Sequence, residues 1–110
     1  MSGWTVVMLP EAAAEIAALP TSLRTRFQRI VDLVETLGLP RLREPYVKHL
    51  EGKLWEMRMI GQDGHARAVY VAANGRRAVV LHVFVKKEQR TPRNALDTAR
   101  RRAARAGLAS

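Results

Sequence analysis

Cysteine is absent from this chain of 110 residues, which excludes disulfide bonds and thiolate-ligated zinc sites. Aromatic residues are scarce, at 5% of the chain, and no apolar run approaches the roughly 20 residues that a membrane-spanning helix needs. The N-terminus also lacks the pattern of a signal peptide, so we expect a cytoplasmic protein without membrane association. At this length we expect a single domain, residues 1–110.

Histidine and acidic residues are too scattered for several kinds of active site. The three histidines, His49, His65 and His82, lack the spacing of a metal site or of an acid–histidine–nucleophile arrangement. A nuclease that uses two metal ions needs several convergent carboxylates, and the sparse acids of the second half form no such cluster in the sequence. We therefore expect neither a metal nor another cofactor.

The basic residues are concentrated in the second half of the chain. Residues 1–47 carry five Lys or Arg and five Asp or Glu, whereas residues 48–110 carry fourteen basic and five acidic residues. The whole formal net charge of +9 therefore lies in the second half. Such a distribution favours a polyanionic partner, most often nucleic acid, although a merely soluble basic surface would have the same composition.

Hydrophobic periodicity and turn residues predict an α+β domain. Strands are expected at residues 4–9, 54–60, 65–73 and 77–85, and helices at 11–19, 21–37 and from 91 onward. Residues 39–53 carry scattered charges and are predicted to form a loop. The order of elements indicates a small, mainly antiparallel sheet with an N-terminal helical hairpin on one face and a basic C-terminal helix.

Capping residues mark the expected helix ends. Thr21 or Ser22 is expected to cap the second helix, and Gly38 to end it. Thr91 is expected to cap the last helix, with Pro92 at its first position. That helix has a thin apolar face, which is expected from Ala95, Leu96, Ala99 and Ala103.

Basic residues in the strands are candidates for chemistry on a phosphate. Strand alternation puts Arg58 on the face opposite Trp55, and Arg67 falls in the middle of the next strand, where a charge needs a reason. Lys86 and Lys87 point to opposite faces, so at most one of them faces a given groove. A purely structural interpretation also exists for each: a solvated cation, or a cross-strand salt bridge in the case of Arg67.

The ring side chains have competing interpretations. Tyr70 either stacks on a nucleic-acid base or packs in the core, and core packing is the commoner outcome. His82 lies in an apolar strand and is expected to be a hydrogen-bonded core residue. Trp55 is expected in the core. Arg90, close to the start of the last helix, either contacts phosphate or is solvated.

Three short motifs occur in register along the second half: KLWEMR at 53–58, RAVY at 67–70 and LHVFVKKEQRTP at 81–92, followed by a helix rich in Ala and Arg. In these motifs and in its order of elements, the chain resembles the RelE/HigB-type toxins of bacterial type II toxin–antitoxin modules, in particular their HigB-like, phage-derived branch. The resemblance implies a RelE-like fold. It also implies a metal-independent endoribonuclease that cuts mRNA in the ribosomal A site, inhibits translation and arrests growth.

The resemblance assigns roles to particular residues. The catalytic role falls on Arg58, Arg67 and Lys86. Contacts to mRNA or ribosomal RNA fall on a second group, Lys48, His49, Lys53, Tyr70, Lys87 and Arg90. Several HigB-type enzymes use histidines and a C-terminal acidic and aromatic group, but this chain ends in RRAARAGLAS and offers no such group. Those roles are therefore not transferred.

The partners that the resemblance implies are the ribosome, mRNA and a HigA-like antitoxin with a helix-turn-helix domain that neutralises the toxin. Operator DNA would be bound only through the complex with that antitoxin. Two other classes of function explain the same basic half of the chain. One is a non-catalytic RNA- or ribosome-binding module, and the other is a protein-interaction domain whose basic face docks an acidic partner.

Overall fold

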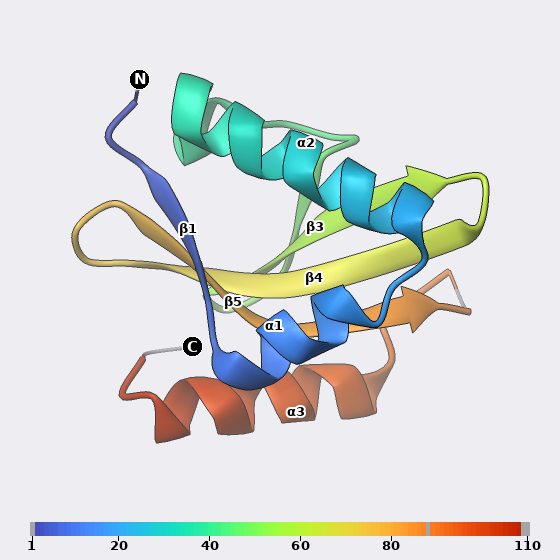
Figure 1. Ribbon diagram of the computed structural model, residues 1–110. Helices are drawn as coiled ribbons and strands as arrows, with labels where there is room; N and C mark the ends of the chain where they lie inside the picture. Colours follow the sequence, from blue (N-terminus) through green and yellow to red (C-terminus); the bar gives the residue numbers. More distant parts are fainter. Residues whose placement is uncertain (1, 88, 109–110) are drawn as a thin grey trace.

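The computed structural model describes residues 2–87 and 89–108, so Glu88 of the third sequence motif lies outside the described residues. Figure 1 shows the order of the elements along the chain. The strands are β1 (Thr5–Met8), β2 (Val47–Glu51), β3 (Leu54–Gly61), β4 (Gly64–Ala73) and β5 (Arg77–Lys86). The α-helices are α1 (Pro10–Ala17), α2 (Thr21–Leu37) and α3 (Arg93–Arg105), and a 3₁₀ turn, η1, spans Leu39–Arg41. None of these helices is long and apolar enough to cross a bilayer.

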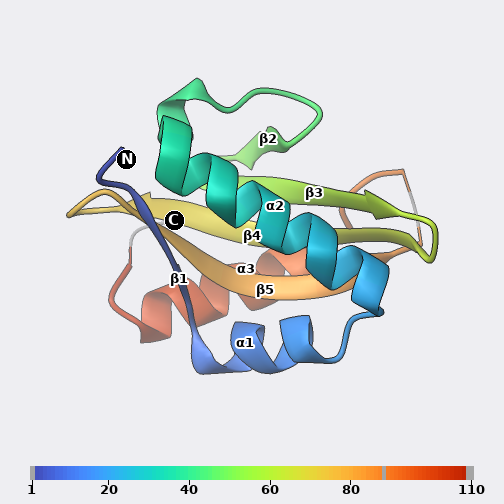
Figure 2. The ribbon, with the colours of Figure 1, turned by 45° about the horizontal axis from the view of Figure 1, so that its top comes forward.

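One sheet contains all five strands, in the order β1-β5-β4-β3-β2. β1 runs parallel to β5, and every other pair of neighbours is antiparallel. α2 covers one face of the sheet and α3 the other, while α1 lies alongside β5, close to α3 (Figure 2). The predicted α+β class is confirmed, with helices on both faces of a mainly antiparallel sheet.

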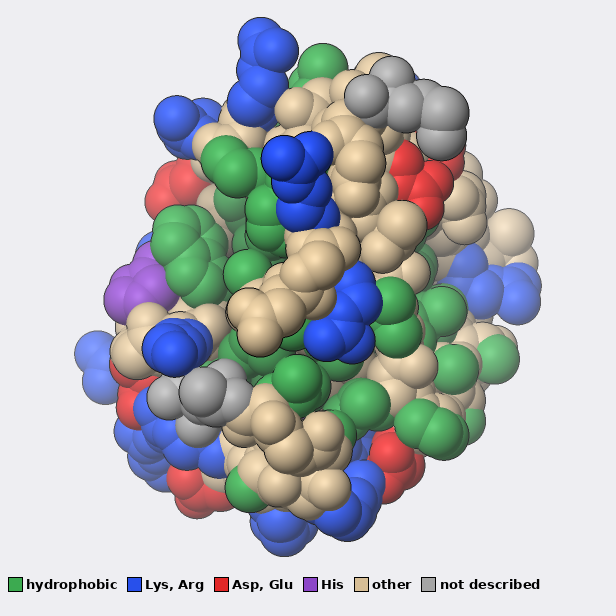
Figure 3. Space-filling view, turned by 90° about the vertical axis from the view of Figure 1, so that its left-hand side faces the viewer, with side chains coloured by type: hydrophobic (Ala, Val, Ile, Leu, Met, Phe, Trp, Pro, Cys, Tyr) green, Lys and Arg blue, Asp and Glu red, His purple; other side chains and the backbone are tan. Residues whose placement is uncertain are grey.

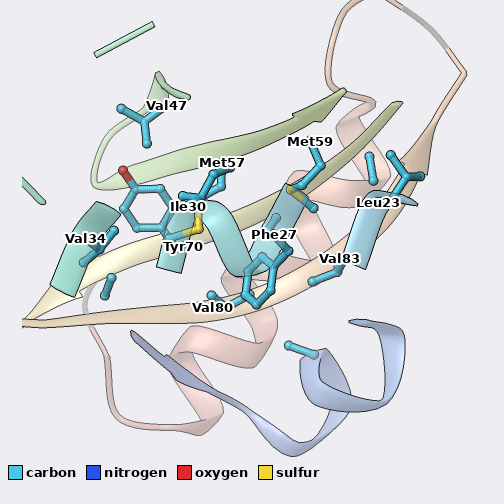
Figure 4. Packing of buried hydrophobic residues seen from close by; sticks show 14 of the residues in the cluster. Leu23, Phe27, Ile30, Val34, Val47, Met57, Met59, Tyr70, Val80 and Val83 are labelled. Carbon is cyan, nitrogen blue, oxygen red and sulfur yellow. The ribbon is translucent and has the colours of Figure 1, made fainter. Parts of the chain in front are cut away.

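The larger core lies between α2 and the sheet (Figure 4). Apolar residues recur every three or four positions along α2 and are at most 4% exposed: Leu23, Phe27, Ile30 and Val34. They meet side chains from three central strands, Met57, Met59, Tyr70, Val80 and Val83. Burying each large apolar side chain stabilises the fold by roughly 1.5–3 kcal/mol, so this layer holds α2 and the sheet together.

The predicted loop at residues 39–53 is wrong over part of its length, because residues 47–51 form the edge strand β2. This strand pairs antiparallel with β3, and Val47 is buried against the core. The sequence VKHLE contains too few apolar residues to show clear strand alternation. Its conformation is decided by the hydrogen bonds to β3, which sequence pattern does not report.

Two predicted caps are also wrong. The Ser22 hydroxyl donates to Asp63 Oδ2 at 2.8 Å, and no side chain caps α2. The Thr91 hydroxyl donates to Glu56 Oε1 at 2.8 Å, and no side chain caps α3. Both hydroxyls bond to distant carboxylates in place of the local backbone. Gly38 does end α2, with a φ of 91° that favours glycine.

α3 is anchored by an apolar face and by ion pairs at both of its ends. Leu96, Ala99 and Ala103 pack on the sheet, as predicted. Its arginines bond to acids of other elements: Arg93 and Arg100 to Glu51, Arg102 to Glu15, and Arg105 to Glu11. Because these acids neutralise much of the helix, the unpaired positive charge of the protein lies mainly elsewhere.

The ion pairs between α1 and α3 predict a loss of stability in acid. Burial alone would raise the pKa of Glu15, but hydrogen bonds from Arg102, the Val83 N–H and His82 lower it below the ordinary value of 4.5. A carboxylate with a depressed folded-state pKa contributes stability that is present above its unfolded-state pKa and is lost as the pH falls through the folded-state value. We therefore expect the free energy of unfolding, measured with urea, to decline as the pH falls below 4.5.

The variant Glu15→Gln separates this contribution from that of the other acids. It should be less stable than the wild type at neutral pH and should show a shallower decline in acid. The exposed Asp32 lies on α2 away from this network, so Asp32→Asn is the matched control. An acid decline in Glu15→Gln as steep as that of the wild type would contradict the assignment.

Candidate functional site: a cationic hollow on the open part of the sheet

The part of the sheet face that α3 leaves open carries charged side chains from four strands. Lys48 on β2 pairs with Glu56 on β3, and Arg58 on β3 pairs with Arg67 on β4. Lys86 continues the same face at the end of β5. The structure thus brings together Arg58, Arg67 and Lys86, the three residues to which the resemblance assigned catalysis.

A hollow of about 450 Å³ lies between this face and the connection from β5 to α3; we call it the cationic hollow. Its lining comes from β2, β3, β4, the β5–α3 connection and the start of α3, and includes Lys48, His49, Glu51, Glu56, Arg67, Arg90, Thr91 and Arg93. Among these residues Glu51 is already bonded to α3, and Glu56 is bonded to Arg67. The hollow therefore presents mainly positive charge to a ligand.

A buried ion pair forms the floor of the cationic hollow. Glu56 is 0% exposed and Arg67 is 4% exposed, and the Arg67 guanidinium donates a hydrogen bond to Glu56 Oε2. The other carboxylate oxygen accepts the hydroxyl of Thr91 at 2.8 Å. A buried charge is tolerated only when it is paired and hydrogen-bonded, so Glu56 fixes the position of the Arg67 guanidinium and ties the β5–α3 connection to the sheet.

Arg58 stands beside this pair without sharing its hydrogen bonds. Its Nε lies 3.8 Å from Glu56 Oε2, too far for a hydrogen bond, and this buried Nε has no hydrogen-bond partner among the described residues. The side chain as a whole is 23% exposed. Its guanidinium can therefore contact a bound anion from a position that the backbone of β3 holds fixed.

Lys86 titrates in the field of its neighbours. Partial burial lowers the pKa of its amine, and the guanidinium groups of Arg67 and Arg58 lower it further, against the opposing effect of Glu56. Burial also lowers the pKa of Arg67, but an arginine remains charged at any physiological pH. Repulsion between like charges of this kind is relieved when a phosphate binds among them.

The proposed RNA-contact residues are not all at this site. Lys48 and Arg90 line the cationic hollow, and Lys87 is exposed directly after β5. Lys53 lies apart, in the turn between β2 and β3, where it lines a different hollow together with Arg77. The structure therefore gives no support to a shared role for Lys53.

Tyr70 lies where the commoner of its two expected outcomes puts it, whereas Trp55 departs from expectation. Tyr70 is 2% exposed and packs in the core on the α2 side of the sheet, opposite Arg58, which confirms core packing and gives no support to the RNA contact that the resemblance assigned to it. Burial also raises the pKa of its phenol. Trp55, predicted in the core, is 39% exposed; it lies at the start of β3, paired with His49 of the edge strand β2.

His49 and His82 each have partners within the fold. His49 lies at the rim of the cationic hollow, but its ring contacts Trp55 edge-to-face at 5.1 Å, and its Nε2 is 2.8 Å from Gly52 O. His82 is partly buried and hydrogen-bonded to Glu15 at 3.1 Å, which confirms the expectation of a satisfied histidine. Neither geometry leaves a histidine directed at the Arg58–Arg67 pair.

Figure 3 views the protein from the end that bears the β4–β5 turn. There, Lys and Arg side chains lie among hydrophobic and acidic ones.

The sequence did not predict that Glu56 and Thr91 belong to the site. A signal for Glu56 was present, because strand alternation already put this acid on the same face as Arg58, two residues away. An acid and an arginine in the middle of neighbouring antiparallel strands indicate a cross-strand pair. Thr91 gave no such signal, since its local sequence suited a helix cap equally well.

Residues 14–104 match a family model described as phage-derived protein Gp49-like. The chain belongs to this family. The match spans most of the chain and agrees with the phage-derived branch that the three sequence motifs indicated. Among curated proteins, none matches this Gp49-like chain.

Solved structures show that the Gp49-like chain has the fold of RelE toxins. A double mutant of the Escherichia coli toxin RelE in the free state aligns with 91% of this chain and 97% of its own, with 21% identity and a TM-score of 0.64. A RelE–RelB complex from Pyrococcus horikoshii gives 23% identity, coverages of 76% and 94%, and a TM-score of 0.57. The toxin–antitoxin complex RelBE2 from Mycobacterium tuberculosis gives 18% identity, coverages of 76% and 99%, and a TM-score of 0.55. The expected RelE-like fold is confirmed.

Proposed function

We propose that this protein is a toxin that cleaves mRNA on the ribosome and so inhibits translation. The observation that carries the proposal is the convergence of Arg58, Arg67 and Lys86 on one open sheet face, beside a hollow lined by further cations. Membership of the Gp49-like family and the RelE fold support it, because the similar solved structures are toxins of toxin–antitoxin pairs. Its place of action is then the cytoplasm, where translation occurs.

The chemistry that suits this site is cleavage by the neighbouring 2′-hydroxyl of RNA. The 2′-oxygen loses its proton and attacks phosphorus, the bond from phosphorus to the 5′-oxygen breaks, and that oxygen takes up a proton. The products are a 2′,3′-cyclic phosphate and a free 5′-hydroxyl. Arg58, Arg67 and Lys86 stabilise the negative charge that builds up on the phosphoryl oxygens, which is the contribution that fixed cations make best.

The Glu56–Arg67 pair supports a catalytic site over a mere binding surface. Surface cations that only hold RNA are flexible and solvated, whereas Arg67 is buried and fixed by a buried carboxylate. Fixed donors need little reorganisation in the transition state, and that is where electrostatic catalysis gains its effect. In this proposal Glu56 is a positioning residue, because it acts on the phosphate through Arg67.

The proposed partners are mRNA, the ribosome and an antitoxin. Two of the similar solved structures contain RelE-type toxins with their RelB-type antitoxins, which supports an antitoxin as partner. We propose a HigA-like antitoxin with a helix-turn-helix domain, through which the complex would bind operator DNA. Lys48 and Arg90, which line the cationic hollow, and Lys87, exposed directly after β5, are proposed to hold phosphates of mRNA or ribosomal RNA.

A message with a single 2′-deoxyribonucleotide tests the proposed chemistry. Ribosomes programmed with all-ribose mRNA should yield cut product with a cyclic phosphate end. The same message with 2′-deoxyribose on the 5′ side of the cut phosphate should stay intact at that position, because the attacking oxygen is missing. Equal cutting of both messages would exclude attack by the 2′-oxygen. Binding of both messages without any cutting would favour a non-catalytic RNA-binding module.

A further inference from the structure

A second cationic hollow lies at the edge of the sheet, on the other side of Arg58. It measures about 440 Å³ and is lined by Arg26, Arg29, Ile30, Pro45, Tyr46, Arg58 and Ile60; we call it the edge hollow. Three of these side chains are arginines, and neither Asp nor Glu is among them. None of these residues except Arg58 was assigned a role by the sequence.

The fold fixes the walls of the edge hollow. Arg26 and Arg29 are three residues apart on α2 and so share a face of the helix, and Ile30, 2% exposed, anchors that part of α2 to the core. Opposite them, the carbonyl oxygen of Tyr46 accepts the backbone N–H of Arg58 at 2.9 Å. This bond places Tyr46 next to β3, just beyond the last residue of β3 that pairs with β2.

Unlike most arginines of α3, the two arginines that α2 contributes to the edge hollow are not neutralised by acids of the described residues. Within the described part of the chain, no acid lies within 4.0 Å of Arg26 or Arg29. Residues 1–47 are formally neutral, but two of their acids, Glu11 and Glu15, are bonded to arginines of α3 and so do not neutralise Arg26 or Arg29. α2 is thereby left with a local surplus of positive charge.

Aromatic and apolar groups beside these cations indicate which polyanion would fit. Tyr46 is 39% exposed and Ile60 is 49% exposed, so both present apolar surface to a ligand. Proteins that bind single-stranded nucleic acid combine a positive groove for the backbone with exposed aromatic rings on which bases stack. An acidic peptide would use the arginines but would gain nothing specific from an aromatic ring at this position.

Arg58 joins the edge hollow to the cationic hollow. Its side chain lines the former, and its Nε lies 3.8 Å from Glu56 Oε2, on the floor of the latter. We propose that the edge hollow binds single-stranded RNA adjoining the nucleotides at the Arg58–Arg67 site, with phosphates on Arg26 and Arg29 and a base on Tyr46. This inference rests on the proposed function, since it extends the path of the same RNA.

Binding of a labelled 12-nucleotide RNA, followed by fluorescence anisotropy over a range of salt concentrations, tests the proposal. The double variant Arg26→Ala/Arg29→Ala should bind more weakly, and its dependence of log affinity on log salt should be shallower by about 1.4, for two phosphate contacts at roughly 0.7 each. Tyr46→Ala should lose about tenfold in affinity with an unchanged salt slope, because stacking is not ionic. Tyr46→Phe, which keeps the ring, should bind as the wild type does.

The control Arg24→Ala/Arg41→Ala removes the same charge outside the edge hollow and should leave the salt slope nearly unchanged. The proposal is overturned if this control loses as much RNA affinity as the Arg26→Ala/Arg29→Ala variant. It is also overturned if the Arg26→Ala/Arg29→Ala variant binds RNA like the wild type. The proposal is likewise overturned if the wild type does not bind the RNA, or if Tyr46→Ala weakens the binding of an acidic peptide as strongly as it weakens the binding of RNA.

Cleavage of translated mRNA by the same variants distinguishes this proposal from the proposed function. Normal cleavage and normal RNA binding by the Arg26→Ala/Arg29→Ala variant would overturn the proposal that the edge hollow binds RNA, but would leave the proposed nuclease function unaffected. Absence of cleavage by the wild type, together with the expected losses of RNA binding, would overturn the nuclease and support the edge hollow as an RNA-binding surface.

Discussion

Replacement of Lys86 by alanine is expected to reduce mRNA cleavage by a factor of about 10²–10³, the effect of removing one fixed charge-stabilising group from an active site. The side chain is partly exposed and makes no ion pair among the described residues, so its loss should leave the fold intact. Growth arrest on expression should be lost in parallel. The measurement is the rate of cleavage in single-turnover reactions with programmed ribosomes, alongside the melting temperature of each variant.

The variant Lys86→Arg distinguishes the role of the charge from that of the amine. Partial burial and the neighbouring guanidinium groups of Arg67 and Arg58 lower the pKa of Lys86 below its ordinary value of 10.5. Cleavage that needs the charged amine must therefore decline as the pH rises through this lowered pKa. Lys86→Arg, which stays charged, should retain part of the activity and move the decline to higher pH.

The exposed arginine Arg101 on α3 supplies a control for the loss of one positive charge. Arg101→Ala should cleave like the wild type, because Arg101 lines neither hollow. Full cleavage activity in Lys86→Ala would show that Lys86 has no role in catalysis. Residual activity in Lys86→Ala that declines with rising pH as it does in the wild type would show that another group is titrating.

Disruption of the buried Glu56–Arg67 pair is expected to have the largest effect on stability. Removal of one partner leaves the other as an uncompensated buried charge, which typically costs about 3–5 kcal/mol. Glu56→Ala should therefore lower the free energy of unfolding, measured with urea, by about this amount. Because a domain of this size is stable by only about 5–15 kcal/mol, the milder Glu56→Gln, which keeps an acceptor for Thr91, provides a variant that still folds.

The double variant Glu56→Leu/Arg67→Met shows whether the pair serves stability or function. Replacement of a buried ion pair by apolar side chains of similar volume is often neutral or stabilising, so the double variant should recover most of the stability that Glu56→Ala loses. It should nevertheless be inactive, because the fixed guanidinium is gone. A double variant that cleaves mRNA normally would refute the role of Arg67, and a Glu56→Ala variant as stable as the wild type would refute the buried pair.

The sequence predicted the architecture well where periodicity was strong. α2 and the strands from Leu54 to Val85 have regular spacing of apolar residues, and each lies within a residue or two of its expected bounds. β2 was missed because an edge strand of five mostly polar residues carries no clear alternation. Its conformation depends on hydrogen bonds to β3, a tertiary property that local sequence does not encode.

The candidate site was predicted in part. Alternation within single strands correctly put Arg58 opposite Trp55, and the resemblance selected Arg67 and Lys86 on neighbouring strands. Register between strands decides which of these side chains meet: it pairs Arg67 with Arg58, and the Arg67 guanidinium reaches diagonally to Glu56. Exposure could not be predicted from residue type either, as the exposed Trp55 shows.

The arginines of α3 illustrate the limit of charge counting. The sequence places many basic residues there, but the structure pairs four of them with acids. Meanwhile, the formally neutral first half supplies the unpaired arginines of the edge hollow. The distribution of free charge depends on which acids the fold brings to which cations, so net charge per segment was a poor guide to the surface.

The most direct test of the nuclease site maps the 5′ ends of a defined mRNA in a translating extract that contains the wild-type protein or Lys86→Ala. The same RNA without ribosomes is analysed in parallel. The account predicts new ends with the wild type, in register with codons and only on translated message, and their near disappearance with Lys86→Ala. Codon-register ends of equal abundance with both proteins, or no new ends with the wild type although the RNA is bound, would contradict it.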